Sequence, residues 1–149
     1  MANVTPKLRL AVLCSHIVFD ANGLPFSLQE PFHTVQPGPG KTFPFEPVPM
    51  FLYTQLEDAV GTFRFRVVTR DETGIEVSRT PYMEVTFDGT SNRVIPAELT
   101  FELRGFRFPK PGIYYFHVIC NHASLSDVKE TESHPFPAPR LHVLSGDSL

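Results

Sequence analysis

The sequence contains no tryptophan, only two cysteines and three methionines among its 149 residues, and just 19% of its residues are charged. Cysteine is too scarce for a disulfide scaffold. Thirteen basic and 16 acidic side chains leave a net charge of -3, which gives no support to a nucleic-acid or anionic-membrane partner. No apolar run approaches the roughly 20 residues that a membrane-spanning helix needs. These absences favour a soluble globular chain.

Proline and phenylalanine are abundant instead. Fifteen prolines, about twice the usual share, and 14 phenylalanines argue against a helical protein. With 42% hydrophobic residues, the composition is that of an ordinary globular chain. At this length we expect one domain, spanning residues 1–149, with a core that needs no disulfides.

The first residues resemble a lipoprotein signal, because Lys7 and Arg9 precede an apolar run that ends at Cys14. The run before the cysteine covers only residues 10–13, whereas a signal peptide needs about 7–15 apolar residues. We therefore interpret this segment as the first strand of a cytoplasmic protein. In the reducing cytoplasm, Cys14 and Cys120 are expected to stay unpaired as small buried hydrophobic residues.

Apolar and polar residues alternate with a period of two in one segment after another, which is typical of β-strands. The segments with this pattern are residues 8–14, 24–35, 51–56, 63–68, 75–77, 83–87, 99–103, 113–120 and 140–144. Turn signals separate them, such as Asn22-Gly23, Gly61 and Asp71–Gly74. The pattern predicts an all-β fold, a single antiparallel β-sandwich of eight or nine strands, immunoglobulin-like or a related Greek key.

One stretch holds no period. Residues 121–139 are polar and contain two histidines and three prolines. Loops beyond about 12–15 residues are uncommon in compact domains, and many of them are functional or disordered. We expect a long polar loop here, before the last strand.

Two local patterns occur together in this chain. A strand near the start carries Cys14-Ser-His16, and a strand near the end begins Pro111-Gly112-Ile-Tyr114-Tyr-Phe116. This arrangement resembles a family of small uncharacterised bacterial proteins, known only as a domain of unknown function. The resemblance spans roughly residues 8–145 and implies a single β-sandwich domain. It implies no catalytic or ligand-binding residue.

Tyr114 also has a physical role of its own. Pro111-Gly112 makes a sharp corner before the strand. We expect Tyr114 to enter the core with its hydroxyl bonded to a nearby backbone carbonyl, as in a tyrosine corner.

Histidine and cysteine residues lie close together near the end of one predicted strand, which is the most specific indication of a metal site in the sequence. His117, Cys120 and His122 are residue types that bind zinc. Their spacing is unfavourable, because His117 and Cys120 lie three positions apart and so point to opposite faces of a strand. Cys14 and His16 do share a face, but we expect that face to be the core. A metal-binding or hydrolytic domain is therefore the alternative to the main prediction.

The remaining signal indicates interaction. Ile113, Tyr115 and Ile119 lie on the nominally outward side of a strand whose other side is already apolar. They form either a hydrophobic patch that binds a protein partner or a surface covered by residues 121–139. A second contact surface, or an edge guarded against mispairing, is formed by Phe43, Phe45 and Phe51, which are interspersed with prolines.

Motifs of catalysis are missing from the sequence. It holds no Gly-x-Ser-x-Gly elbow, no Walker-type loop and no dinucleotide fingerprint. The main prediction is a non-enzymatic binding or assembly module that needs no cofactor. Its expected partner is another protein or a second copy of the chain, in a homo-oligomer, and neither a nucleic acid nor a membrane.

Overall fold

The computed structural model describes residues 3–23, 25–37, 42–46, 50–89, 96–126 and 137–145. Within these residues the chain forms eleven strands and no helix. The strands are β1 (Lys7–Phe19), β2 (Pro25–Pro31), β3 (Thr34–Val35), β4 (Phe51–Glu57), β5 (Val60–Asp71), β6 (Glu76–Arg79), β7 (Met83–Asp88), β8 (Ala97–Glu102), β9 (Gly112–Cys120), β10 (Ala123–Ser124) and β11 (Arg140–Val143). Because β3 and β10 have only two residues each, the longer strands agree with the predicted number.

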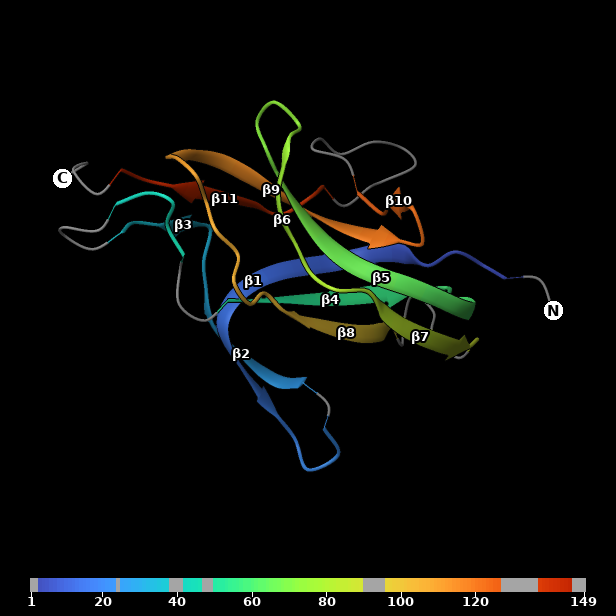
Figure 1. The fold of residues 1–149 in the computed structure, drawn as a ribbon. Helices are drawn as coiled ribbons and strands as arrows, with labels where there is room; N and C mark the ends of the chain where they lie inside the picture. Colours follow the sequence, from blue (N-terminus) through green and yellow to red (C-terminus); the bar gives the residue numbers. More distant parts are fainter. Residues whose placement is uncertain are drawn as a thin grey trace.

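The strands form two sheets that pack face to face (Figure 1). The smaller sheet has the order β2-β1-β4-β8. The larger sheet has the order β3-β11-β9-β5-β6, with β7 paired to β5 and β10 paired to β9. All described pairs are antiparallel except the short pair of β3 with β11. The predicted all-β sandwich is confirmed.

The main core lies between the sheets and consists of the inward residues of the central strands. On β5 these are Phe63, Phe65 and Val67, and on β9 they include Tyr114 and Phe116. Each such side chain is almost fully buried, and a buried side chain of this size stabilises a fold by about 1.5–3 kcal/mol. The alternation predicted for both strands is therefore confirmed.

Tyr114 forms the expected corner. Its hydroxyl donates a hydrogen bond of 2.6 Å to the backbone carbonyl of Lys110, four residues upstream. Its ring lies 4.7 Å from the ring of Phe108, measured between centroids. The bond ties the loop before β9 to the core.

The first strand differs from the prediction. Its register against β4 shifts between Leu8 and Leu10, which marks a bulge, and a bulge changes which residues face the core. Leu8, Ala11 and Leu13 therefore pack in the main core. Cys14 lies in a separate cluster on the outer side of the smaller sheet, so the expectation that it faces the main core was wrong.

Two glycines have different roles at the predicted turns. Gly23 ends a turn in which its N–H donates to the carbonyl of Asp20 at 3.0 Å, as expected. Gly61 lies within β5, and the chain reverses just before it at Asp58, which has a positive φ of 59°. A Cβ atom at Gly61 would come within 2.2 Å of the side-chain oxygen of Asn3, so this glycine permits a close approach of the N-terminal segment.

Part of the predicted polar loop at 121–139 can be placed. Residues 127–136 lie outside the described residues. Asn121, with a φ of 57°, starts a reversal that returns the chain alongside β9 as β10. The N–H of Asn121 donates to the Arg64 carbonyl at 2.7 Å, and its Oδ1 accepts from the Arg64 N–H at 3.0 Å. The reversal is therefore anchored to β5.

Candidate functional site: the outer face of the larger sheet

The outer face of the larger sheet brings charged and aromatic residues from three strands into one row. Tyr115 of β9 lies opposite Arg140 of β11 on one side and opposite Arg70 of β5 on the other. Residues opposite each other in a sheet share a face. We call these three residues the arginine–tyrosine row. In the next position along β9, Ile113 lies opposite His142.

The two arginines of this row have no carboxylate partner among the described residues. Arg140 is exposed and Arg70 is half-buried, and neither lies within 4.0 Å of a described carboxylate. Arg64 and Arg66, further along β5, are engaged instead: their Cζ atoms lie 4.4 and 3.8 Å from the ring centroid of Tyr82. Within the described part of the chain, the two arginines of the arginine–tyrosine row are therefore not held in ion pairs.

The acidic residues around Arg70 already have partners of their own, and Glu76, which lies opposite Arg70 on β6, is 3.7 Å from Arg79 Nε. Asp71 accepts hydrogen bonds from the N–H and the hydroxyl of Thr73 and from the N–H of Ile75, closing the predicted hairpin turn. The Thr73 side chain is the main reason that the pKa of Asp71 is lowered. Glu72 accepts a bond of 3.1 Å from the N–H of Ile113. Both carboxylates are thus held at the β5–β6 turn.

Two depressions flank the arginine–tyrosine row. One, of about 470 Å³, is lined by residues that include Arg70, Tyr115, His117 and Ser124, together with the Asp71–Gly74 turn. The other, of about 560 Å³, is lined by His33, Thr34, Ile113, Arg140 and His142. Among the described residues that line the second depression there is no carboxylate, and Arg140 gives this lining a positive charge.

His117 and Ser124 meet in the first depression but are not arranged as a base and a nucleophile. His117 Nδ1 lies 3.0 Å from the Ser124 hydroxyl and 3.3 Å from the Ser126 carbonyl oxygen. A carbonyl only accepts, so the contact with Ser126 is a hydrogen bond in the tautomer that carries its proton on Nδ1. The Ser124 hydroxyl donates its own proton to the Ser126 carbonyl at 2.7 Å. In that tautomer the imidazole does not accept the serine proton, as a general base would.

The structure separates the residues proposed as metal ligands. His117 is buried on the outer side of β9, whereas Cys120 lies in the main core, where burial raises the pKa of its thiol to about 11. His122 is exposed in the turn before β10. Among the described residues, no group of three or more His, Cys, Asp or Glu side chains is arranged to hold a metal ion.

The proposed contact residues on β9 fall into two groups. Ile119 is buried beside β10, which pairs with it. Leu125 continues this cover, because its N–H donates to the Val118 carbonyl at 2.8 Å. Ile113 and Tyr115 remain half-buried at the other end of the strand. Among the described residues, the cover expected from residues 121–139 is therefore found beside Ile119, at the β10 end of β9.

Phe43 and Phe45 lie half-buried against the main core. Phe45 exchanges two backbone hydrogen bonds with Phe108, of 2.9 and 2.8 Å. The rings of Phe43 and Phe45 are 6.3 Å apart in an edge-on arrangement. These contacts give both residues a role in closing the sandwich.

Arg70 and Arg140 were not predicted as site residues from the sequence. The outward position of Arg70 follows from the same alternation that placed Arg64 and Arg66 outward. Arg140 gave no such signal, because nothing local shows that β11 pairs with β9.

The comparisons with known proteins identify a family for this chain but no relative of known function. No curated protein matches the chain. In the part of the chain that the structure describes, no helix is long and apolar enough to cross a membrane. Residues 9–129, well over half of the chain, match a family of unknown function (DUF6941), and the chain therefore belongs to this family.

Proposed function

We propose that this chain is a bacterial, cytoplasmic, non-enzymatic binding module, a single domain whose larger sheet binds an acidic segment of a protein partner on its outer face. The observation that carries the proposal is the arginine–tyrosine row, in which Arg70 and Arg140 lie on either side of Tyr115 and neither has a carboxylate within 4.0 Å among the described residues. The two free and buried thiols fit the reducing cytoplasm.

The composition of the row supports a protein partner. Arginine and tyrosine are the residue types that carry much of the binding energy in protein interfaces. Arginine binds carboxylates through two parallel hydrogen bonds, which fixes their position. With strands about 4.8 Å apart, the two arginine backbones are about 10 Å from each other. That spacing allows two carboxylates to flank an apolar side chain resting on Tyr115.

A metal-binding or hydrolytic function has less support. The Ser124 proton is bonded to a carbonyl rather than to His117. Burial raises the pKa of both cysteine thiols, which disfavours the reactive thiolate. These features fit structural roles for the serine and the cysteines.

The test uses a fluorescent 12-residue peptide, rich in glutamate around one central phenylalanine, and follows its binding to the full chain by fluorescence anisotropy. The double variant Arg70→Glu/Arg140→Glu is expected to weaken binding about tenfold or more, equivalent to 1.4 kcal/mol. The matched control is Arg104→Glu/Arg107→Glu, which makes the same change in net charge away from the row.

The control should stay within about threefold of the unchanged protein, because surface ion pairs such as those of Arg104 and Arg107 contribute little. An equal loss in both variants would show a general charge effect and overturn the proposal. So would the absence of binding. A second copy of the chain is the other possible partner of the row, and sedimentation of the protein alone tests it. A dimer that only Arg70→Glu/Arg140→Glu breaks would assign the row to self-association instead.

A further inference from the structure

The outer edge of β8 is open in the part of the chain that the structure describes. β8 ends the smaller sheet and pairs only with β4. The opposite end of the sheet is β2, which begins and ends with a proline, and proline has no N–H with which to bind another strand. β8 contains no proline. The two ends of the sheet therefore differ in their capacity to accept a further strand.

The register shows which backbone groups of β8 point outward. The Leu103 N–H donates to the Met50 carbonyl at 2.9 Å, which continues the β4–β8 ladder. Bonded and non-bonded pairs alternate along an antiparallel ladder. Leu99 and Phe101 are therefore bonded to β4, while the N–H and C=O groups of Glu98, Thr100 and Glu102 point away from it. This edge offers three consecutive pairing positions.

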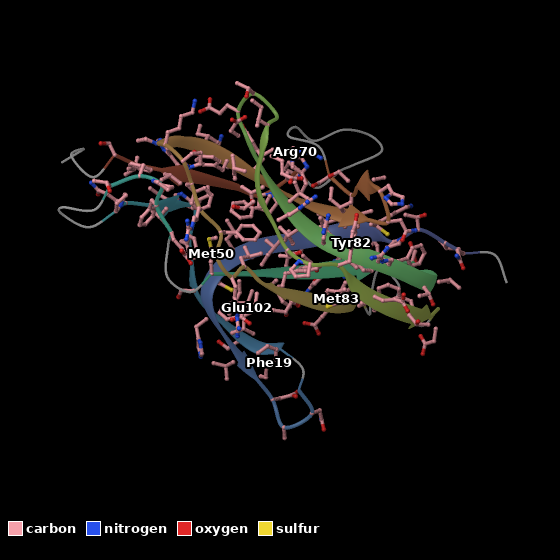
Figure 2. All side chains as sticks on the ribbon, in the orientation of Figure 1. Phe19, Met50, Arg70, Tyr82, Met83 and Glu102 are labelled. Carbon is pink, nitrogen blue, oxygen red and sulfur yellow. The ribbon has the colours of Figure 1, made fainter. Side chains whose placement is uncertain are left out.

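The inward side chains next to this edge are incompletely covered. Met83 and Val85 of β7 and Ala97 and Leu99 of β8 pack against the main core but stay half-buried. The two strands follow one another in the chain and lie on the same side of the sandwich (Figure 1), where Figure 2 labels Met83. A strand added beside β8 would cover Leu99 and extend the core. These half-buried residues indicate where the alternate side chains of such a strand would point.

The outward side chains at this edge are acidic. Glu98 and Glu102 are exposed and lie on either side of Thr100, on the face turned away from the core. The Tyr53 hydroxyl donates to Glu98, and Arg104 Nε donates to Glu102 at 2.7 Å. Both carboxylates stay accessible at the edge, where opposite charges on a neighbouring strand are favourable. Charge complementarity thus calls for lysine or arginine on the added strand.

We propose that β8 binds an extended segment of a protein partner by strand addition, and that in this segment apolar and basic residues alternate. The apolar residues cover Leu99 and its neighbours, and the basic residues face Glu98 and Glu102. This edge is a different surface from the arginine–tyrosine row, and it rests on a different observation.

The test is amide hydrogen exchange in the full chain with a nine-residue peptide of alternating valine and lysine. The amides of Glu98, Thr100 and Glu102 should exchange at least about tenfold more slowly when the peptide is bound. A peptide of the same sequence, with methyl groups on the amides that face β8, should give no protection, because it cannot form the ladder.

The variant Glu98→Lys/Glu102→Lys sharpens the test. It should lose affinity for the lysine peptide and gain affinity for a peptide of alternating valine and glutamate. Protection elsewhere, for example on β2, would overturn the proposal. Equal protection by the methylated peptide, or no binding at all, would also overturn it.

Discussion

Two tyrosines project outward from central strands of the two sheets, and their surroundings differ. Tyr53 of β4 lies opposite Val12 and Thr100, and only 5% of its surface is exposed. Tyr115 of β9 lies opposite Arg140 and Arg70 and stays half-buried. The residue type and the strand pattern are the same. The cross-strand neighbours make the difference.

Around Tyr53 the outer face is closed on itself. Leu10, Leu28 and Phe51 pack against the buried cluster that contains Tyr53 and Cys14. The Tyr53 hydroxyl donates to Glu98 and accepts a bond of 2.8 Å from the Gln55 side chain. The Tyr53 hydroxyl thus has both an acceptor and a donor beside it. A tyrosine in such a setting stabilises the fold, whereas one between two cations is available to a ligand.

The largest expected effect is a difference in the free energy of unfolding when each of the two tyrosines is replaced by alanine. Tyr53→Ala should lower the free energy of unfolding by about 3–5 kcal/mol, because it empties a buried site. Tyr115→Ala should cost about 1 kcal/mol or less, as surface substitutions usually do. Urea denaturation of both variants measures the difference. Equal losses would mean that the two outer faces do not differ in the way described.

Alkaline pH should lower the stability of the fold through Tyr53. Burial, and next to it the hydrogen bond to Glu98, raises the pKa of Tyr53 from 10.0 to about 12. The folded state therefore holds this proton more tightly than the unfolded state. The stability that this contributes is present below pH 10 and is lost as the pH rises towards 12.

The measurement is the free energy of unfolding as a function of pH in the unchanged protein and in Tyr53→Phe. The variant cannot ionise at this position, so its alkaline loss should be smaller. The phenylalanine keeps the packing of the ring, which makes it the matched control for Tyr53→Ala. Identical alkaline profiles would contradict the assignment of the raised pKa to Tyr53.

The smallest expected effect is on the reactivity of the two cysteines, which lie in different buried clusters. Cys14 belongs to the outer cluster around Tyr53, and Cys120 belongs to the main core. Burial raises the pKa of both thiols. Both should react with a disulfide reagent at least about tenfold more slowly in the native protein than in denaturant. Fast native reaction of Cys14 would show that the outer cluster opens easily.

Much of the fold could be predicted because it depends on local alternation. The inward residues of β5 and β9 and the corner at Tyr114 follow from neighbouring residues alone. The face of Cys14 did not, because one extra residue at the bulge near Leu8 changes the facing of the rest of β1. Local patterns cannot show such a shift.

The candidate site was less predictable, since it depends on which strands become neighbours. The sequence placed Tyr115 outward but gave no sign that Arg140 would lie beside it. It also left open how much of β9 is covered, and the structure shows β10 alongside Ile119 but not alongside Tyr115. Pairing between distant segments decides both points, and period-two alternation carries no information about it.

The most direct test maps the glutamate-rich peptide onto the two outer faces by amide chemical shifts in isotope-labelled protein. We expect shifts at Arg70, Tyr115 and Arg140, with Tyr53 and Val12 unchanged. Shifts centred on Tyr53, or spread equally over both sheets, would contradict the claim that the larger sheet carries the binding face.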